Sequence, residues 1–179
     1  YPGATNIVLK MNFGEDGTIY GAQALGQEGV DKRIDVIATA IKGNLTIYDL
    51  QEIEVAYAPP YNAAKDPVNI LGYVAENMLN DDVRLVNYDE LDEYLAAENG
   101  ILIDVRTKTE FENGAIPNAI HMDVDTLREN LDFFDKNKKY VIYCQIGLRG
   151  YLAQRILRNN DIDSVNLNGG YGLWKPVNS

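Results

Sequence analysis

The order of apolar and polar residues differs between the two halves of the chain. In the first half, the apolar stretch Ile7–Phe13 predicts a strand. Gly14–Gly17 is a turn signal, so residues 18–26 can pair back with that strand as a hairpin. Apolar residues at helical spacing then predict a helix over residues 30–40, which ends at Gly43-Asn44.

The remainder of the first half continues this mixed pattern. Thr46 predicts the start of a short helix, and residues 54–58 look like a further strand that ends at Pro59-Pro60. Asp66 predicts the start of another helix, because Pro67 then occupies its favoured first position. We therefore expect an α+β unit in the first half.

In the second half, strands and helices alternate. Strands are predicted at 83–87, 101–105, 140–143 and 164–167, and helices at 88–97, 123–134 and 148–159. This alternation is typical of an α/β fold with a mainly parallel sheet. The polar segment Leu79–Asp82 separates the two patterns, so we expect one domain at 1–80 and another at 83–179.

Composition narrows the possible functions. The net charge of −11 is spread over both halves, and nucleic-acid binding is not expected because phosphate contacts need a basic face. No apolar run approaches the length that spans a membrane. A single cysteine rules out an internal disulfide and fits a cytoplasmic protein. The chain opens on Tyr1, and we expect further sequence upstream.

That single cysteine, Cys144, stands at a strand-to-helix turn. Backbone N–H groups of such a turn and the following helix N-terminus favour an anion, and Arg149 adds a permanent positive charge. We therefore expect Cys144 to ionise readily and to act as a nucleophile. The alternative from the residues alone is a buried structural thiol.

Three stretches of the second half carry a family resemblance. They are Leu102–Arg106 followed by Glu110-Phe111 and Gly114–Ala119, then Cys144-x-x-Gly147-x-Arg149, and finally Leu167–Gly170 with Trp174. In this order they resemble the rhodanese family of sulfurtransferases. The resemblance implies that Cys144 forms a persulfide. It would take a sulfur atom from a sulfane-sulfur donor and pass it to a thiol acceptor.

The resemblance also implies roles for neighbouring residues. Cys144 and Arg149 would be catalytic, and the backbone of the active loop would hold the terminal sulfur. Asp104 would accept hydrogen bonds that brace the loop, and Arg106 would add positive potential or a salt bridge. Trp174 and the glycines before it would pack behind the loop, and His121 would be structural. The loop residues are Gln145, Ile146, Gly147, Leu148 and Gly150.

The first half carries a second resemblance. Gly21-Ala22-Gln23, Gly29–Asp35, Tyr57–Tyr61 and Ala64–Asn69 are similar to the dimerisation domain of flavin-dependent pyridine nucleotide–disulfide oxidoreductases, nearest the coenzyme A-disulfide reductase branch. This implies a homodimer through residues 1–80 and upstream reductase domains that bind FAD and NAD(P)H. It also implies that Tyr57 and Tyr61 reach the partner subunit's coenzyme A site. We expect no cofactor and no metal in this chain itself.

These observations leave two main hypotheses. The first is a sulfurtransferase attached to a coenzyme A-disulfide, coenzyme A-persulfide or polysulfide reductase. The second is a non-catalytic rhodanese-fold module that binds a partner or senses redox state. A phosphatase or arsenate reductase is disfavoured, because four residues separate Cys144 from Arg149, one fewer than in the related phosphatase loops.

Overall fold

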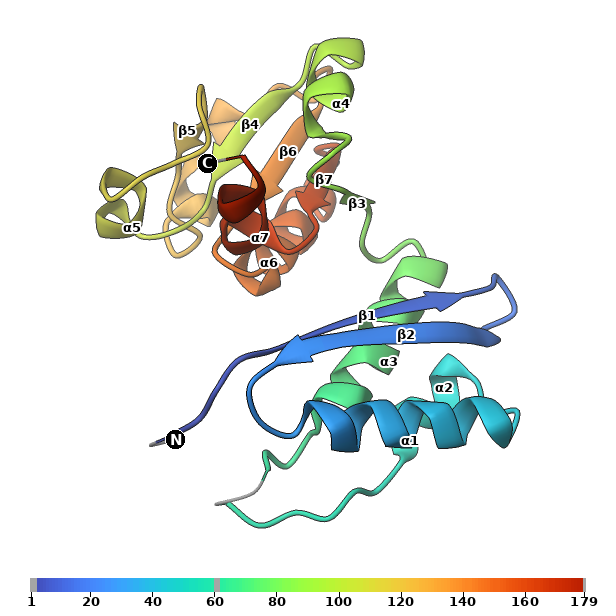
Figure 1. The fold of residues 1–179 in the computed structure, drawn as a ribbon. Coiled ribbons are helices and arrows are strands. Elements are labelled where there is room, and N and C mark those ends of the chain that lie inside the picture. Colours follow the sequence, from blue (N-terminus) through green and yellow to red (C-terminus); the bar gives the residue numbers. More distant parts are fainter. Residues whose placement is uncertain (1–2, 60–61, 179) are drawn as a thin grey trace. The chain divides into compact units, whose positions relative to one another are not determined.

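The computed structural model describes residues 3–59 and 62–178 (Figure 1). The chain forms two compact units, Tyr1–Asn80 and Asp81–Ser179, each with its own hydrophobic core. In the described ranges, no helix has the length and apolar character needed to cross a membrane.

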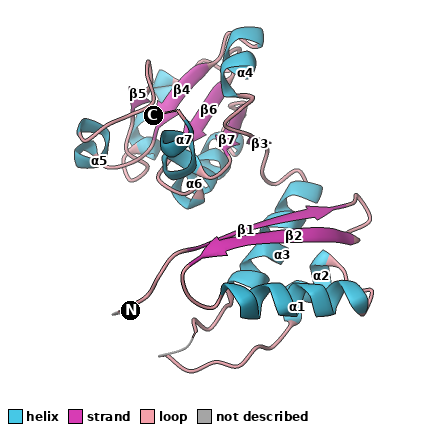
Figure 2. Ribbon diagram, in the orientation of Figure 1, coloured by secondary structure: helices cyan, strands magenta, loops and turns pink. Residues whose placement is uncertain are grey.

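The first unit is an antiparallel hairpin packed with helices (Figure 2). Its elements are β1 (Ile7–Phe13), β2 (Ile19–Gly26), α1 (Val30–Lys42), α2 (Ile47–Glu52) and α3 (Pro67–Leu79). The predicted hairpin and the three predicted helix starts are confirmed. Thr46 and Asp66 each form a capping box at the start of their helices, which satisfies backbone N–H groups that a helix leaves unpaired.

The predicted strand at residues 54–58 is wrong. These residues form no strand, because they pair with neither strand of the β1–β2 sheet, and an extended segment without a paired neighbour is not a strand. The chain just before it is held instead by a side chain: Asn69 Nδ2 donates to the carbonyls of Leu50 and Ile53 at 2.8 and 2.9 Å.

The second unit contains a five-stranded sheet in the order β3-β7-β6-β4-β5, in which every pairing is parallel. The mainly parallel sheet expected from the sequence is therefore confirmed. Its strands are β3 (Leu85–Val86), β4 (Ile101–Asp104), β5 (Ile120–His121), β6 (Tyr140–Tyr143) and β7 (Ser164–Leu167). Its helices are α4 (Leu91–Ala97), α5 (Lys108–Glu112), α6 (Leu148–Arg158), α7 (Gly170–Val177) and the 3₁₀ segment η1 (Leu127–Phe133).

Two separate apolar layers cover the two faces of this sheet. Ile103 and Ile142 face the layer that includes α6 and η1, whereas Leu102 and Val141 face the layer that includes α4 and α7. Successive side chains of a strand point to opposite faces, so strands buried on both faces read as continuous apolar runs. This explains why β4 and β6 could be recognised from the sequence.

Several boundaries in the second unit differ from the predictions. The helix predicted at 123–134 is a shorter 3₁₀ segment whose backbone leaves helical geometry at Asn130. The strand predicted at 83–87 keeps two residues, since it pairs with β7 only at Leu85 and Val86. The elements α5 and β5 were not predicted because they are short, and α7 was not predicted because Gly170, Gly172 and Pro176 are poor helix formers.

Removing the Asp66 carboxylate should destabilise the first unit. Asp66 is buried and lies 2.9 Å from Nη2 of Arg33, which is also buried. Asp66→Ala leaves that guanidinium without its charge partner, which should cost about 3–5 kcal/mol of unfolding free energy. Urea unfolding followed by circular dichroism reports both units, while fluorescence of Trp174, the only tryptophan, reports the second.

The matched control for this substitution is Glu28→Ala, which removes an exposed carboxylate of the same unit. Only Asp66→Ala should lower the urea concentration at which the first unit unfolds. An equal effect of both variants would contradict the role assigned to the Arg33–Asp66 pair.

Candidate functional site

The candidate site lies where β4 and β6 end. Asp104 and Tyr143 are paired in register on these parallel strands, so the residues that follow leave the sheet at the same edge. Cys144 follows β6 directly, and Arg106 stands two residues beyond β4. Ligands of open parallel sheets bind at this carboxyl edge.

Cys144 is 1% exposed, and its sulfur accepts the backbone N–H of Gly147 at 3.1 Å. Gly147 has φ 113° and precedes α6, so glycine permits the turn that brings this N–H back to the sulfur. The sulfur thus lies near the N-terminus of α6, where the partial positive charge of the helix favours an anion.

The start of α7 holds the loop from behind. The N–H groups of Tyr171 and Gly172 donate to the carbonyls of Cys144 and Gln145, each at 2.8 Å. In a trans peptide the N–H points opposite to the carbonyl, so the N–H groups of Gln145 and Ile146 face away from α7. Gly170 makes this approach possible, because a Cβ there would lie 2.4 Å from the Cys144 oxygen.

Asn166 of β7 fixes the other end of the loop. Its Nδ2 donates to the Gly147 carbonyl at 3.0 Å. A Cβ at Gly150 would lie 2.1 Å from Asn166 Oδ1, so the absence of a side chain there lets α6 pack on β7. The active loop is therefore held through its backbone from two elements.

Asp104 and Arg106 form a buried ion pair at the edge of the loop. Arg106 Nη2 lies 2.6 Å from Asp104 Oδ2, and the two side chains are 2% and 0% exposed. Burial works against the charged form of Arg106, but hydrogen bonds and attraction from Asp104 outweigh it and raise its pKa. Arg106 Nη1 contacts Gln145 Oε1 at 3.3 Å, so Asp104 reaches the loop through Arg106 rather than directly.

Arg149 makes a bidentate pair with Glu110 of α5. Both guanidinium nitrogens lie 2.7 Å from a carboxylate oxygen. Hydrogen bonds from Arg149 lower the pKa of Glu110 to about 2, against the opposing effect of partial burial. The same pairing raises the pKa of Arg149, and the Cys144 sulfur contributes in the same direction.

The structure brings most of the predicted site residues together. Cys144, Gln145 and Gly147 occupy one loop, Arg149 lies in the first turn of α6 directly after it, and Arg106, paired with Asp104, contacts the loop. Their catalytic roles stay predictions. His121 Nε2 donates to the Arg106 carbonyl oxygen at 2.8 Å, in agreement with the structural role expected for it. Within residues 3–59 and 62–178, no cluster of His, Cys, Asp or Glu could hold a metal ion.

Tyr57 and Tyr61 belong to the first unit. Tyr57 is 56% exposed, and Tyr61 lies outside the described residues. Exposure leaves the Tyr57 phenol available to another chain, but its contact with coenzyme A stays a prediction.

Sequence reasoning missed three residues that shape the site: Glu110, Asn166 and Tyr171. A signal existed for Glu110, because Thr107-x-x-Glu110 has the spacing of a capping box, which the structure forms at α5. Nothing in the sequence linked Asn166 or Tyr171 to the loop, because both reach it by tertiary packing.

Comparison with known proteins places this geometry in a family. The model of the rhodanese-like domain matches residues 87–176. The chain belongs to the rhodanese-like domain family. That match includes the Cys144 loop, Asp104 and Arg106, and the start of α7.

Individual relatives are sulfur and disulfide enzymes. Over 79 residues, the chain is 49% identical to the coenzyme A disulfide reductase of Staphylococcus haemolyticus, covering 44% of this chain and 18% of that one. The reduced CoADR-RHD of Bacillus anthracis superposes with a TM-score of 0.95 at 46% identity, over 99% of this chain and 32% of that one. A NAD-dependent persulfide reductase from A. fulgidus superposes with a TM-score of 0.87 at 37% identity, over 97% of this chain and 31% of that one. The chain therefore spans less than a third of the length of these relatives.

Replacing Glu110 should weaken the second unit in a pH-dependent way. A depressed carboxyl pKa stabilises the folded state above the ordinary value of 4.5, and this contribution is lost as the pH falls toward about 2. Glu110→Gln should lower the free energy of unfolding by about 1 kcal/mol at pH 6 and by less at pH 3. The effect is modest because the pair is partly exposed. Urea unfolding followed by Trp174 fluorescence measures this change in the free energy of unfolding.

Glu112→Gln is the control for this experiment, because Glu112 lies on the same helix and meets Lys108 only at 3.8 Å in an exposed pair. A cost for Glu110→Gln that is the same at both pH values would contradict the assigned pairing.

Proposed function

We propose that this chain is a sulfurtransferase whose Cys144 carries a persulfide. The thiolate attacks the sulfane sulfur of a donor, the new S–S bond forms as the donor's S–S bond breaks, and the donor leaves with that electron pair. An acceptor thiolate then attacks the terminal sulfur and releases the Cys144 thiolate. Neither step requires an external oxidant or reductant, because sulfur is exchanged between two S–S bonds.

The contact between the Gly147 N–H and the Cys144 sulfur is the observation that carries this proposal. It shows a backbone donor already directed at the reacting atom. The N–H groups of Gln145 and Ile146, turned away from α7, are further donors for the terminal sulfur. Donors fixed before the reaction stabilise a developing anion at little reorganisation cost.

Arg149 supports the same reaction as a charged neighbour of the sulfur. Its guanidinium is oriented by Glu110, so its charge is fixed in place rather than free to rotate. A fixed positive charge beside the sulfur stabilises the negative charge that develops there during sulfur transfer. The sulfur-enzyme relatives support this assignment over a purely binding role.

We further propose that residues 1–80 are the dimerisation domain of a coenzyme A-disulfide, coenzyme A-persulfide or polysulfide reductase of a reducing, cytoplasmic compartment. In such a protein, upstream domains bind FAD and NAD(P)H, and Tyr57 and Tyr61 approach coenzyme A in the partner subunit. Tethering the sulfurtransferase to the reductase raises the effective concentration of the transferred sulfur. The coenzyme A disulfide reductase relatives support this arrangement.

An apolar stripe on α3 supports the homodimer. Ile70, Val74 and Met78 follow one another at intervals of four residues and are 48%, 41% and 39% exposed. Residues at this spacing share one face of a helix, so α3 presents an apolar face that stays partly exposed in the described chain. A second copy of the chain could bury it.

Cys144→Ser should abolish sulfur transfer from thiosulfate to cyanide, with a loss of at least about a thousandfold, because the hydroxyl cannot accept sulfur. Wild-type protein treated with thiosulfate should also gain the mass of one sulfur atom on the peptide that contains Cys144. Lys138→Gln, an exposed substitution outside the site, is the control.

Equal transfer activity in wild-type protein and Cys144→Ser would exclude the catalytic role of Cys144. An inactive wild-type protein that gains no sulfur would favour the alternative, a rhodanese-fold module that binds or senses.

Val74→Asp should convert the dimer to a monomer, because an interface cannot bury an unpaired carboxylate without a large cost. Light scattering at micromolar concentration measures the mass, and circular dichroism checks the fold. Val177→Asp, in the second unit and more exposed than Val74 at 55%, should stay dimeric. A wild-type monomer, or a dimeric Val74→Asp variant, would rule out this interface.

A further inference from the structure

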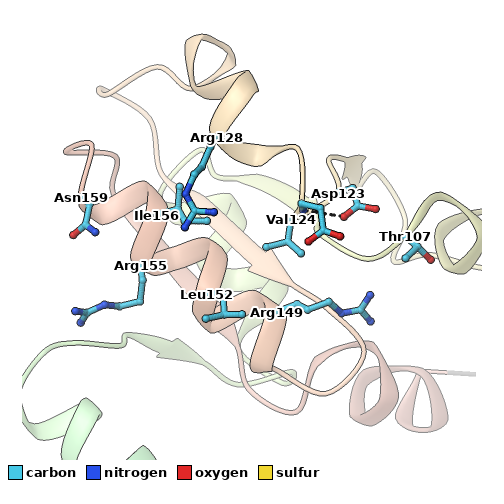
Figure 3. Close-up of a pocket in the computed structure, with 10 residues that line it drawn as sticks. Thr107, Asp123, Val124, Arg128, Arg149, Leu152, Arg155, Ile156 and Asn159 are labelled. Atoms are coloured by element: carbon cyan, nitrogen blue, oxygen red, sulfur yellow. Dashed lines mark hydrogen bonds between the residues drawn. The ribbon is translucent and has the colours of Figure 1, made fainter.

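A cavity of about 330 Å³ lies next to the active loop, between α6 and the segment that leads into η1 (Figure 3). Arg149 belongs both to the loop and to the wall of this cavity. The other lining residues are Thr107, Asp123, Val124, Asp125, Arg128, Leu152, Arg155, Ile156 and Asn159. Its volume is at the lower end of the range for small-molecule sites.

One face of α6 leads from the active loop into this cavity. Leu148, Leu152 and Ile156 follow at intervals of four residues, so they form one apolar row along the helix. At 1.5 Å per residue the row is about 12 Å long. Leu148, the first residue of α6, and Leu152, one turn further on, are 64% and 47% exposed. A ligand with an apolar, extended arm fits this surface.

The arginines of the cavity differ in their partners. Arg149 pairs with Glu110, and Arg155 pairs with Asp82. Within the part of the chain that the structure describes, no carboxylate pairs with Arg128, which is exposed on η1. Arg128 is therefore the cation of this cavity that is available to an anion from solution.

Asp123 lies toward the opposite end of the cavity from Arg128 (Figure 3). Figure 3 shows Asp123 toward Thr107, and Arg128 toward Ile156. Asp123 accepts the backbone N–H of Asp125 at 3.0 Å, so one of its oxygens is already used in the turn. A ligand that places its anionic group at Arg128 and its sulfur at the loop keeps that group away from Asp123.

We propose that this cavity binds the non-reacting part of an extended thiol that carries a carboxylate or phosphate, with the anionic group on Arg128 and the arm along Leu152. The inference rests on the proposed sulfur transfer and names its acceptor class. The acceptor thiolate attacks the terminal sulfur of the Cys144 persulfide, and an S–S bond forms. The bond to Cys144 breaks, and its electron pair returns to the Cys144 thiolate.

Pairs of thiols that differ at their anionic group test the proposal. Glutathione is compared with its dimethyl ester, and 4′-phosphopantetheine with pantetheine, so the two pairs separate a carboxylate from a phosphate. Persulfidated protein is mixed with each thiol, and loss of the added sulfur mass from Cys144 gives the rate. In at least one pair, the anionic member should react about tenfold faster, as a charge-assisted contact to one arginine allows.

Arg128→Gln should reduce the ratio of the two rates, anionic thiol over neutral thiol, to about one. The neutral thiol of each pair serves as the internal reference. Lys138→Gln removes an exposed cation away from the cavity and should keep the ratio. A ratio of one in the wild-type protein, or an unchanged ratio in Arg128→Gln, would overturn the proposal.

A binding measurement separates this inference from the proposed function. S-methylglutathione and S-methyl-4′-phosphopantetheine cannot accept sulfur, and calorimetry reports their affinity directly. Binding of either compound that weakens about tenfold in Arg128→Gln, but not in Lys138→Gln, supports the cavity even if no persulfide forms. If persulfide transfer proceeds but neither compound binds, the cavity assignment fails and the sulfurtransferase proposal stands.

Discussion

The candidate site depends on a single buried guanidinium, that of Arg106. It pairs with Asp104 at the end of β4, donates to the Gly114 carbonyl at 2.7 Å and contacts the Gln145 side chain of the active loop. Its guanidinium carbon lies 4.1 Å from the centre of the Tyr171 ring on α7. Segments far apart in the sequence therefore meet at one charge, which could not stay buried without these partners.

That arrangement explains how a short loop becomes a rigid anion site. Once α7 is held beside the loop, its first N–H groups bind the carbonyls of Cys144 and Gln145 and fix the orientation of two peptide units. Asn166 fixes a third carbonyl, that of Gly147. The loop's own N–H groups are then left for the sulfur. The hydrogen bonds to the carbonyl side of each peptide therefore decide that the N–H side, with its partial positive charge, faces the sulfur.

The positive charges around the loop are used differently. Arg106 is enclosed and structural, Arg149 is partly exposed and held by Glu110, and Arg128 is exposed without a carboxylate partner in the described chain. An acidic protein that keeps such a cation in a cavity next to its active loop can attract an anionic substrate locally despite its overall charge of −11. The apolar row on α6 would then decide which anions fit.

Much of the second unit could be predicted from the sequence, since β4 and β6 are apolar runs and Cys144 with Arg149 marks the turn between strand and helix. The hairpin and helices of the first unit could also be predicted, from turn residues, capping residues and the helical spacing of apolar residues. These signals are local: each depends on residues a few positions apart. The strand predicted at 54–58 failed because a strand needs a partner, and local composition cannot supply one. The same reason explains why only the tertiary structure revealed Asn166 and Tyr171 at the loop, Glu110 on Arg149, and Arg128 beside α6, since those contacts join segments that the sequence keeps far apart.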